Sequence, residues 1–377
     1  MKKIESDTDH PLGGEEFSRP EPSAADPRAS KAVSVVMPVY NTPEEFLIPA
    51  LEGILHQSLD NFELLVIDDG SDRPTKDILR RYAAADRRVK IISRPHSNAG
   101  QARNEGLRRA EGESIIFLDS DDLFHPDLLR LCYARLAESD ADMVVFPYLE
   151  YTDPEHSSPG GCRLDGLPPL FSPEDYPEDI FLRLFPGAWN KLFRLSFFKQ
   201  KGLFFQSARA ANDLCCVLTA VTRAKKIAIL DTPLVQYRIS NTASIVHSVD
   251  DLVPYHLEAS LRLKKNLEAD QTWPAFREPF YQMFFLCLAL RFFDLPVRKQ
   301  REEEKAIRQE YLASLELTAE VIPLLPEYLR CFAGLIIFGK PPLVFGKVRY
   351  FNGWKEIFLF GKAIRRYKSE HRPRNQS

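Results

Sequence analysis

The chain has 377 residues, of which 44% are apolar and 27% are charged, and its formal net charge at pH 7 is -3. These values are typical of a soluble globular protein, and the slightly acidic balance excludes a general attraction to nucleic acid. The six cysteines show neither a metal-ligand spacing nor a compact disulfide framework, so we expect free thiols in a reducing, cytoplasmic compartment.

The first segment of the chain is predicted to be a disordered leader. Residues 1–30 combine prolines with acidic and small residues and lack the apolar stretch of a secretion signal. Farther along, the apolar runs near residues 284–290 and 331–338 fall short of the roughly twenty apolar residues that a membrane-spanning helix needs. We therefore expect a chain that does not cross a bilayer.

From residue 33 onward, short apolar runs alternate with segments of helical character. This alternation predicts an α/β fold, a mostly parallel sheet flanked by helices. The predicted strands cover residues 33–37, 63–68, 89–93, 114–118 and 143–146, and the predicted helices cover 42–57, 72–82, 101–110 and 126–139. Residues 151–177 are rich in proline, glycine and acidic side chains, which predicts a long loop or lid.

The alternation stops near residue 247, and the pattern becomes helical over residues 257–267, 280–293 and 298–315. We predict three parts: the leader at 1–30, an α/β domain at 31–247 and a helical C-terminal region at 248–377. From residue 340 onward, basic and aromatic residues mix with few acidic ones, which suits amphipathic helices on an anionic membrane surface. A helical cap or a homodimer contact explains this composition equally well.

Three carboxylates fall within four positions directly after the predicted strand 114–118. They belong to Asp119, Asp121 and Asp122. Because open α/β sheets bind their ligands at the carboxyl ends of the strands, these residues are candidates for holding a divalent cation and a diphosphate. Hard oxygen ligands favour Mn²⁺ or Mg²⁺. The alternative is a solvated turn that leads into the next helix.

Four segments taken in series carry a family resemblance. Residues 37–41 (MPVYN), 66–71 (VIDDGS), 98–104 (NAGQARN) and 117–122 (FLDSDD) resemble the family-2 glycosyltransferases, which have the GT-A fold. The resemblance covers about residues 33–247 and implies a Rossmann-like sheet. It also implies metal-dependent, inverting transfer of a sugar from a nucleoside-diphosphate donor, UDP-linked by family preference. The acceptor would be a hydroxyl of a saccharide or lipid-linked molecule, as in surface polysaccharide synthesis at the cytoplasmic face of a membrane.

On the donor side, the resemblance implies that Pro38, Tyr40 and Asp69 hold the base and the ribose. Asn98 and Arg103 lie at the start of a predicted helix, where they would face the diphosphate or the base. For Asp69 the alternative role is helix capping. For Arg103 the alternative is a structural ion pair with a nearby carboxylate.

Within the acidic motif, the resemblance assigns a separate role to each carboxylate. Asp119 would contact the ribose, or the metal through water, Asp121 would ligate the cation directly, and Asp122 would orient the cluster. His247 corresponds to a residue that sometimes completes the metal site in the family. Its alternative role is that of a surface or packing residue.

The acceptor side contains the implied catalytic base. The family places this base in a Glu-Asp pair, and the corresponding residues here are Asn212 and Asp213. Asp213 would take the proton from the acceptor hydroxyl, and its alternative role is to cap the following helix. Asn212 departs from the usual Glu and would bond an acceptor hydroxyl without carrying charge. Trp189 would stack on an acceptor sugar or pack in the core, and Lys191 is a candidate partner for phosphate or a carboxylate.

Three other functions explain parts of the chain. A phosphatase that forms an aspartyl-phosphate would use Asp119 as nucleophile and Asp121 as acid, but it leaves the regions of Tyr40 and Asp69 without a role. A sugar nucleotidyltransferase needs a Gly-rich, basic loop after its first strand, and residues 39–44 do not provide one. The third alternative is a noncatalytic binding module.

Overall fold

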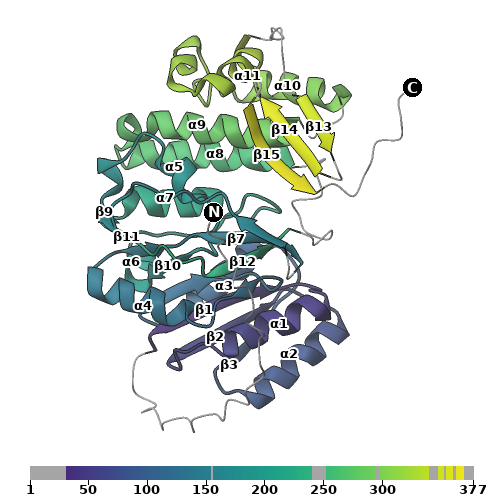
Figure 1. The fold of residues 1–377 in the computed structure, drawn as a ribbon, viewed down its shortest axis with the longest axis vertical. Coiled ribbons are helices and arrows are strands. Elements are labelled where there is room, and N and C mark those ends of the chain that lie inside the picture. The colour runs from purple at the N-terminus through teal and green to yellow at the C-terminus, as the bar shows by residue number, and fades with distance from the viewer. Residues whose placement is uncertain are drawn as a thin grey trace, which may run out of the picture. The chain divides into compact units, whose positions relative to one another are not determined.

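The computed structural model describes residues 31–153, 156–239, 252–293, 295 and 297–338, and three strand segments at 347–351, 354–359 and 362–368 (Figure 1). The predicted disordered leader at 1–30 and the predicted metal ligand His247 lie outside the described residues.

A mixed eight-stranded sheet carries the α/β domain. Its strands are β1 (Val33–Val39), β2 (Phe62–Asp68), β3 (Val89–Ser93), β4 (Ser114–Phe117), β6 (Met143–Val145), β9 (Leu170–Phe171), β10 (Lys191–Arg194) and β11 (Ile227–Ile229). They lie in the order β3-β2-β1-β4-β10-β6-β11-β9. The first four are parallel neighbours, as predicted. All residues of β2 and β4 are buried, as expected of parallel strands covered on both faces.

Seven helices of the described chain connect these strands: α1 (Glu44–Leu55), α2 (Arg73–Ala85), α3 (Ala99–Arg109), α4 (Leu128–Ser139), α5 (Ile180–Leu184), α6 (Leu195–Gln200) and α7 (Leu214–Arg223). Helix α3 packs on β1 and β2, and Gly106 permits the close approach. A Cβ atom at Gly106 would lie 2.3 Å from Cγ1 of Val36. This packing fixes the start of α3 beside the carboxyl ends of β1 and β4.

Residues 151–177 include several regular elements, so the prediction of one long loop or lid over this range is wrong in part; residues 160–169 form no helix or strand. β7 (Tyr148–Asp153) and β8 (His156–Pro159) join β5 (Leu123–Phe124) and β12 (Val235–Arg238) in a second sheet of order β5-β12-β7-β8. A short 3₁₀ helix, η1 (Pro173–Asp175), follows β9. Tyr148 and Tyr151 are buried, and burying these large aromatic rings favours strands despite the nearby prolines and glycines.

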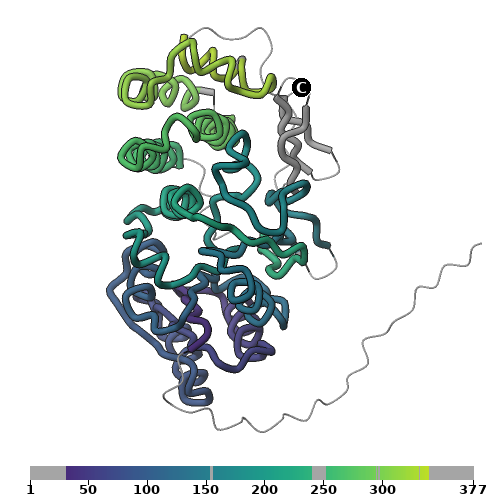
Figure 2. Tube along the Cα trace, turned by 90° about the vertical axis from the view of Figure 1, so that its left-hand side faces the viewer, coloured from purple at the N-terminus to yellow at the C-terminus, as the bar shows by residue number. Residues whose placement is uncertain are grey.

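Beyond the α/β domain, the chain is helical up to Phe338, as predicted. The helices are α8 (Leu252–Ala269), α9 (Trp273–Phe292), α10 (Val297–Glu310) and α11 (Glu327–Phe338), with the 3₁₀ helix η4 (Ala319–Leu324). Helix α8 packs against α7 on one side and α9 on the other, and Figure 2 shows the helices in successive layers. Among the described helices, not one is long and apolar enough to cross a membrane.

The last described elements are strands, so the predicted amphipathic helices in this part of the chain are wrong. β13 (Lys347–Phe351), β14 (Trp354–Leu359) and β15 (Lys362–Lys368) pair antiparallel in that order. The sequence contains two signals for this outcome. Apolar and basic residues alternate with period two in parts of these strands, and Asn-Gly at positions 352–353 is the dipeptide most typical of a tight hairpin.

A charged network joins the amino ends of β1, β2 and β3, and the acidic motif lies at the opposite, carboxyl end of the strands. The carboxylate of Glu63 is 1% exposed and accepts hydrogen bonds from Ser34 Oγ at 2.7 Å, Lys90 Nζ at 2.8 Å and Lys31 Nζ at 3.0 Å. Burial alone would raise the pKa of Glu63, but these bonds outweigh it and lower the pKa to about 2.

This network is expected to make the fold sensitive to acid. Because the folded-state pKa of Glu63 lies below its ordinary value of 4.5, its contribution is complete above pH 4.5 and is lost as the pH falls to about 2. The shift corresponds to about 3 kcal/mol. Urea unfolding across the acid range should show this loss, and Glu63→Gln should remove it. An unchanged pH slope in the variant would contradict the assignment.

Candidate active site

Arg103 joins two parts of the chain that sequence analysis assigned to opposite sides of the site. It projects from α3, and its Nη2 donates to Asp119 Oδ1 at 2.6 Å, just beyond β4. Its Nη1 donates to Asn212 Oδ1 at 2.8 Å, in the loop before α7. The predicted structural ion pair is therefore present. Contact between Arg103 and a donor substrate stays a prediction.

The charge of Arg103 is held in a buried environment. Its side chain is 7% exposed, and the ring of Phe205 lies 5.6 Å from the guanidinium carbon. Burial opposes the positive charge, but the carboxylates of Asp119 and Asp213 outweigh it and raise the pKa of Arg103. Its buried Nε has no hydrogen-bond partner within the described residues. The positive charge of Arg103 thus offsets the negative charges of two carboxylates from separate elements. Its Nε–H is left as an unused hydrogen-bond donor among the described residues.

Asp213 stands at the N-cap position of α7, but its side chain makes no capping hydrogen bond in the described part of the chain. The capping alternative is therefore wrong. Burial raises the pKa of Asp213, and the Arg103 charge partly offsets this increase. A carboxylate that binds its proton more tightly than a surface aspartate is a stronger base, which suits proton removal from a hydroxyl.

The loop that leads to Asp213 is fixed against the start of α3. Asn104 on α3 donates from Nδ2 to Phe205 O and accepts from Phe205 N, both at 2.8 Å. A Cβ atom at Gly100 would lie 2.1 Å from Gln206 O, so only glycine lets the loop approach this closely. Gln206 N donates to Asn212 O at 3.0 Å. The loop and the helix together form one rigid wall of the site.

Asn98 has a structural role at the same helix start. Its Oδ1 accepts from Gln101 N at 3.0 Å and caps α3, and its Nδ2 donates to Ser207 Oγ at 3.3 Å. The predicted contact with a diphosphate or base is an additional role that stays a prediction.

Arg238 on β12 supports the acidic motif from behind. Its backbone N donates to Asp122 Oδ1 at 2.9 Å, and its Nε donates to Asp121 O at 2.8 Å. The guanidinium is sandwiched between the rings of Phe46, at 4.0 Å, and Tyr151, at 4.6 Å. Burial and the neighbouring charge of Asp121 raise the pKa of Asp122 well above its ordinary value. Arg238 and Asp122 therefore hold the strand end in place, in line with the predicted orienting role of Asp122.

The carboxylates after β4 match a divalent cation in chemical type. Asp119, Asp121 and Asp122 offer hard oxygen donors, and the buried Oδ2 of Asp122 has no partner among the described groups. Over the described ranges, no group of three or more His, Cys, Asp or Glu side chains is already arranged to hold a metal. His247 lies outside the described residues, so its predicted pairing with Asp121 at a metal ion stays a prediction.

The predicted base-binding end contains an aromatic pair. Tyr40 follows β1, is 48% exposed, and stacks on His96 with 3.7 Å between ring centroids and 20° between ring planes. Pro38 lies one strand position from the end of β1 and is partly exposed. His96 was not a predicted site residue. Its position shortly after β3, at the same edge of the sheet as Tyr40, is the signal that could have identified it.

Asp69 is buried at this end and serves the loop after β3. Its Oδ2 accepts from Ser97 N at 2.9 Å, and its Oδ1 lies 3.4 Å from Arg94 Nη1. The N-cap of α2 is Asp72, whose side chain accepts from Thr75 N at 3.1 Å, so the capping alternative for Asp69 is wrong. Arg94 and Ser97 were missed by sequence reasoning, since their proximity to Asp69 depends on the pairing of β2 with β3.

Trp189 lies in an aromatic cluster. It is 5% exposed, stacks on Tyr237 with 5.0 Å between centroids and 3° between planes, and meets Tyr148 edge-on at 4.4 Å. This arrangement agrees with the alternative that Trp189 packs in the core. Contact of Trp189 with an acceptor sugar stays a prediction.

Lys191 is buried, and its ammonium group is fully occupied within the chain. Nζ donates to Phe185 O and Gly187 O, both at 2.8 Å, and to Asn190 Oδ1 at 2.6 Å. Burial lowers the pKa of Lys191 to about 8. The predicted partnership of Lys191 with phosphate or a carboxylate is therefore wrong, and its role is to hold together the turn before β10.

Lys191→Met is expected to destabilise the fold without changing donor affinity. The substitution leaves three acceptors without their donor, and each unsatisfied buried group costs about 1–3 kcal/mol. Urea unfolding should report a loss on the order of 3 kcal/mol or more. The exposed Lys225→Met is the control and should stay within about 0.5 kcal/mol of the parent. A near-neutral Lys191→Met would contradict the structural role.

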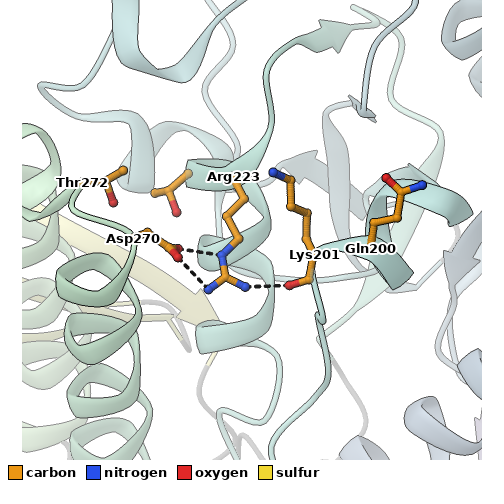
Figure 3. A pocket seen from close by; sticks show the side chains of 6 residues that line it. Gln200, Lys201, Arg223, Asp270 and Thr272 are labelled. Carbon is orange, nitrogen blue, oxygen red and sulfur yellow. Dashed lines mark hydrogen bonds and ion pairs between the residues drawn. The ribbon is translucent and has the colours of Figure 1, made fainter.

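A separate pocket of about 520 Å³ lies near the ends of α6, α7 and α8 (Figure 3). It is lined by Gln200, Lys201, Thr222, Arg223, Asp270 and Thr272. Of the predicted site residues that the structure describes, none lines it. The pocket is therefore distinct from the predicted donor and acceptor site.

Comparisons with known proteins agree with this geometry. The family model described as "Glycosyl transferase family 2" matches residues 34–200. Glycosyltransferase GlyG of Streptococcus pneumoniae serotype 4 is 30% identical over 233 residues, which cover 59% of this chain and 75% of GlyG. EpsH of Bacillus subtilis is 32% identical over 224 residues, or 57% of this chain. The match spans 62% of the length of EpsH.

Solved structures show the same fold. S. aureus TarS 1–349, in a crystal structure with UDP-GlcNAc, superposes with a TM-score of 0.65 and covers 90% of this chain and 99% of TarS 1–349. The sequence identity is 18%, so this likeness concerns the fold alone. The matched family, the identity to GlyG and the shared architecture confirm the resemblance seen in the sequence. The chain belongs to glycosyl transferase family 2 and has the GT-A fold.

Proposed function

We propose that this protein transfers a sugar, with inversion, from a nucleoside-diphosphate sugar to a hydroxyl group of an acceptor. The observation that supports the proposal most directly is the set of contacts around Arg103. The same buried guanidinium bonds Asp119, the candidate donor-side carboxylate, and Asn212, which lies in the loop of the candidate base, Asp213. The family assignment favours this function over the phosphatase, nucleotidyltransferase and binding-module alternatives.

In the proposed reaction, Asp213 accepts the proton of the acceptor hydroxyl. The oxygen then bonds to the anomeric carbon on the face opposite the diphosphate, and the bond between that carbon and the diphosphate oxygen breaks. The bonding electrons leave with the nucleoside diphosphate. Arg103 keeps the positions of Asp119 and Asp213 fixed relative to each other throughout the reaction. Its Nη2 bonds to Asp119, and its Nη1 bonds to Asn212, the neighbour of Asp213. Asn212 contributes by accepting one of these bonds, without a charge of its own.

We further propose that Asp121 ligates Mn²⁺ or Mg²⁺, with His247 as a second ligand. When bound, such a cation neutralises the charge on the departing diphosphate. The oxygen donors after β4 and the unpartnered Oδ2 of Asp122 support this proposal. A UDP-linked donor is supported by family preference and by the UDP-GlcNAc complex of the structural neighbour TarS.

The acceptor and the place of action are also proposals. A saccharide or lipid-linked acceptor at the cytoplasmic face of a membrane agrees with the basic and aromatic composition after residue 340. Sedimentation with anionic liposomes tests this location. Absence of binding at physiological salt would remove the membrane proposal and would favour the cap or homodimer alternative.

A panel of nucleoside-diphosphate sugars, with Mn²⁺ or with EDTA, tests the function. One donor should raise the melting temperature and release its nucleoside diphosphate only with the metal. At about 100 times Kd, binding adds about 2.7 kcal/mol of stability. Asp121→Ala should lose both the stabilisation and the release. Stabilisation by no donor, together with hydrolysis of phosphate esters, would contradict the proposal in favour of a phosphatase.

A further inference from the structure

On the basis of the function proposed above, we propose that α8 acts as a clamp on α7 and thereby positions the candidate base, Asp213, at the start of α7. The positioning residues are Asn266 and Asp270 on the α8 side. The chemistry itself is left to Asp213.

Asp213 depends on its helix for its orientation. It directly precedes Leu214, and Val217 N donates to Asp213 O at 2.8 Å, so the backbone of Asp213 forms part of the first turn of α7. Its side chain makes no capping bond within the described residues that would fix it independently. Ala211, two positions earlier, has a φ of 51°, a left-handed conformation that costs about 1–2 kcal/mol for a non-glycine residue. The position of α7 therefore determines where the carboxylate of Asp213 lies.

The first tie of the clamp lies in the middle of α7. Asn266 on α8 donates from Nδ2 to Thr219 Oγ1 at 3.0 Å and approaches Cys215 Sγ at 3.5 Å. Thr219 and Cys215 are one helical turn apart on the same face of α7, and both are buried. Every residue of α7 before Arg223 is buried, so α7 is packed on all sides. The directional bond from Asn266 adds a restraint on the rotation of α7.

The second tie lies at the end of α7 and is visible in Figure 3. The guanidinium of Arg223 forms a forked pair with Asp270, with Nε to Oδ2 at 2.6 Å and Nη2 to Oδ1 at 3.1 Å. Its Nη1 donates to Lys201 O at 2.7 Å, which joins the end of α6 to the same group. A forked arginine–carboxylate pair fixes orientation as well as distance. The two ties together prevent α7 from sliding or rotating against α8.

The ties matter because catalysis tolerates little misplacement. A displacement of about 1 Å in a reacting group can cost on the order of 10²-fold in rate. The base loop is already held to α3 through Asn104 and Arg103. The clamp supplies the matching restraint from the opposite end of α7, and it makes the helical region part of the catalytic apparatus.

Hydrogen exchange tests the clamp without any ligand. In the full-length Asn266→Ala/Asp270→Ala double variant, exchange should become roughly tenfold faster across residues 206–217, which include the bonded amides of Gln206 and Val217. Residues 62–68 of β2 should be unchanged. The control is Glu258→Ala on α8, which breaks an exposed pair with Arg262 within the same helix. Unchanged exchange at 206–217, or equal acceleration in β2, would overturn the proposal.

Kinetics separate positioning from general loss of structure. With a donor identified by nucleoside-diphosphate release, kcat of the double variant should fall by roughly 10- to 100-fold while the donor KM stays within about twofold. Asp270→Glu keeps the forked pair and should restore most of the activity lost in Asp270→Ala. Equal changes in kcat and KM, or no rescue, would overturn the proposal. If the wild-type protein consumes no donor, the proposed function fails, and the exchange experiment still decides on the clamp.

Discussion

Asp213→Asn is expected to lower kcat for sugar transfer by about 10²–10⁴-fold, the usual contribution of a general base. The amide has nearly the same size as the carboxylate and cannot take a proton at neutral pH. Donor affinity should remain close to that of the parent, because the donor-side groups Asp119 and Asp121 are untouched. Isothermal titration with the donor and initial rates with saturating acceptor measure the two quantities.

The exposed Asp231→Asn serves as the control and should retain full activity. An equal loss of donor affinity and rate in Asp213→Asn would refute the role of Asp213 as base. A variant with unchanged kcat would do the same.

The pH profile gives an independent measure of the same group. The pKa of Asp213 is raised from its ordinary value of 3.8, through burial, so its basic form is lost at a higher pH than that of a surface aspartate. We therefore expect kcat to decline on the acid side at a pH above 3.8. An acid limb at or below that value would show that another group, or none, accepts the proton.

Arg103→Ala is expected to lower the free energy of unfolding by about 3–5 kcal/mol. Removing the guanidinium leaves Asp119 and Asp213 near each other without their counter-charge and leaves Asn212 without its donor. Urea unfolding measures the loss. In the folded fraction, donor turnover should also fall, because the loop before α7 is released from the end of β4.

Arg103→Lys tests whether charge or geometry matters more. A single ammonium cannot reproduce the separate Nη bonds to Asp119 and Asn212, so this variant should recover part of the stability and little of the activity. The control is Arg108→Ala on the same helix, whose exposed pair with Glu105 is worth about 0–1 kcal/mol. Full activity in Arg103→Lys would show that Arg103 acts only through its charge.

Much of the fold could be predicted because local pattern and buried environment agree. The parallel strands β1 to β4 consist of apolar runs that alternate with helices, and the acidic motif follows the last of them as expected. β10 could not be predicted in this way. Its four residues have no distinctive period, and only the pairing of Leu192 with both Ile116 and Val144 shows that it is a central strand.

The site was predicted in its residue types and less well in its contacts. The carboxylates, Arg103 and Asn212 were all identified, but the sequence left the partner of Arg103 open between substrate and a carboxylate. The bond to Asn212 joins residues 109 positions apart and depends on how the loop before α7 folds onto α3. For Lys191 the sequence predicted a phosphate or carboxylate partner, because the residue lies in a segment that resembles the family. In the structure Lys191 is buried and bonds to the turn before β10.

The position of β10 has a consequence for how the protein is made. β4 ends at residue 117, yet its neighbour on one side is the antiparallel strand of residues 191–194. While the chain is still emerging from the ribosome, β4 and β6 present open edges to the cell, and open edges invite aggregation. The acidic motif follows β4 directly. The nascent chain can pair the open edge of β4 with β10 only after residue 194 has left the exit tunnel.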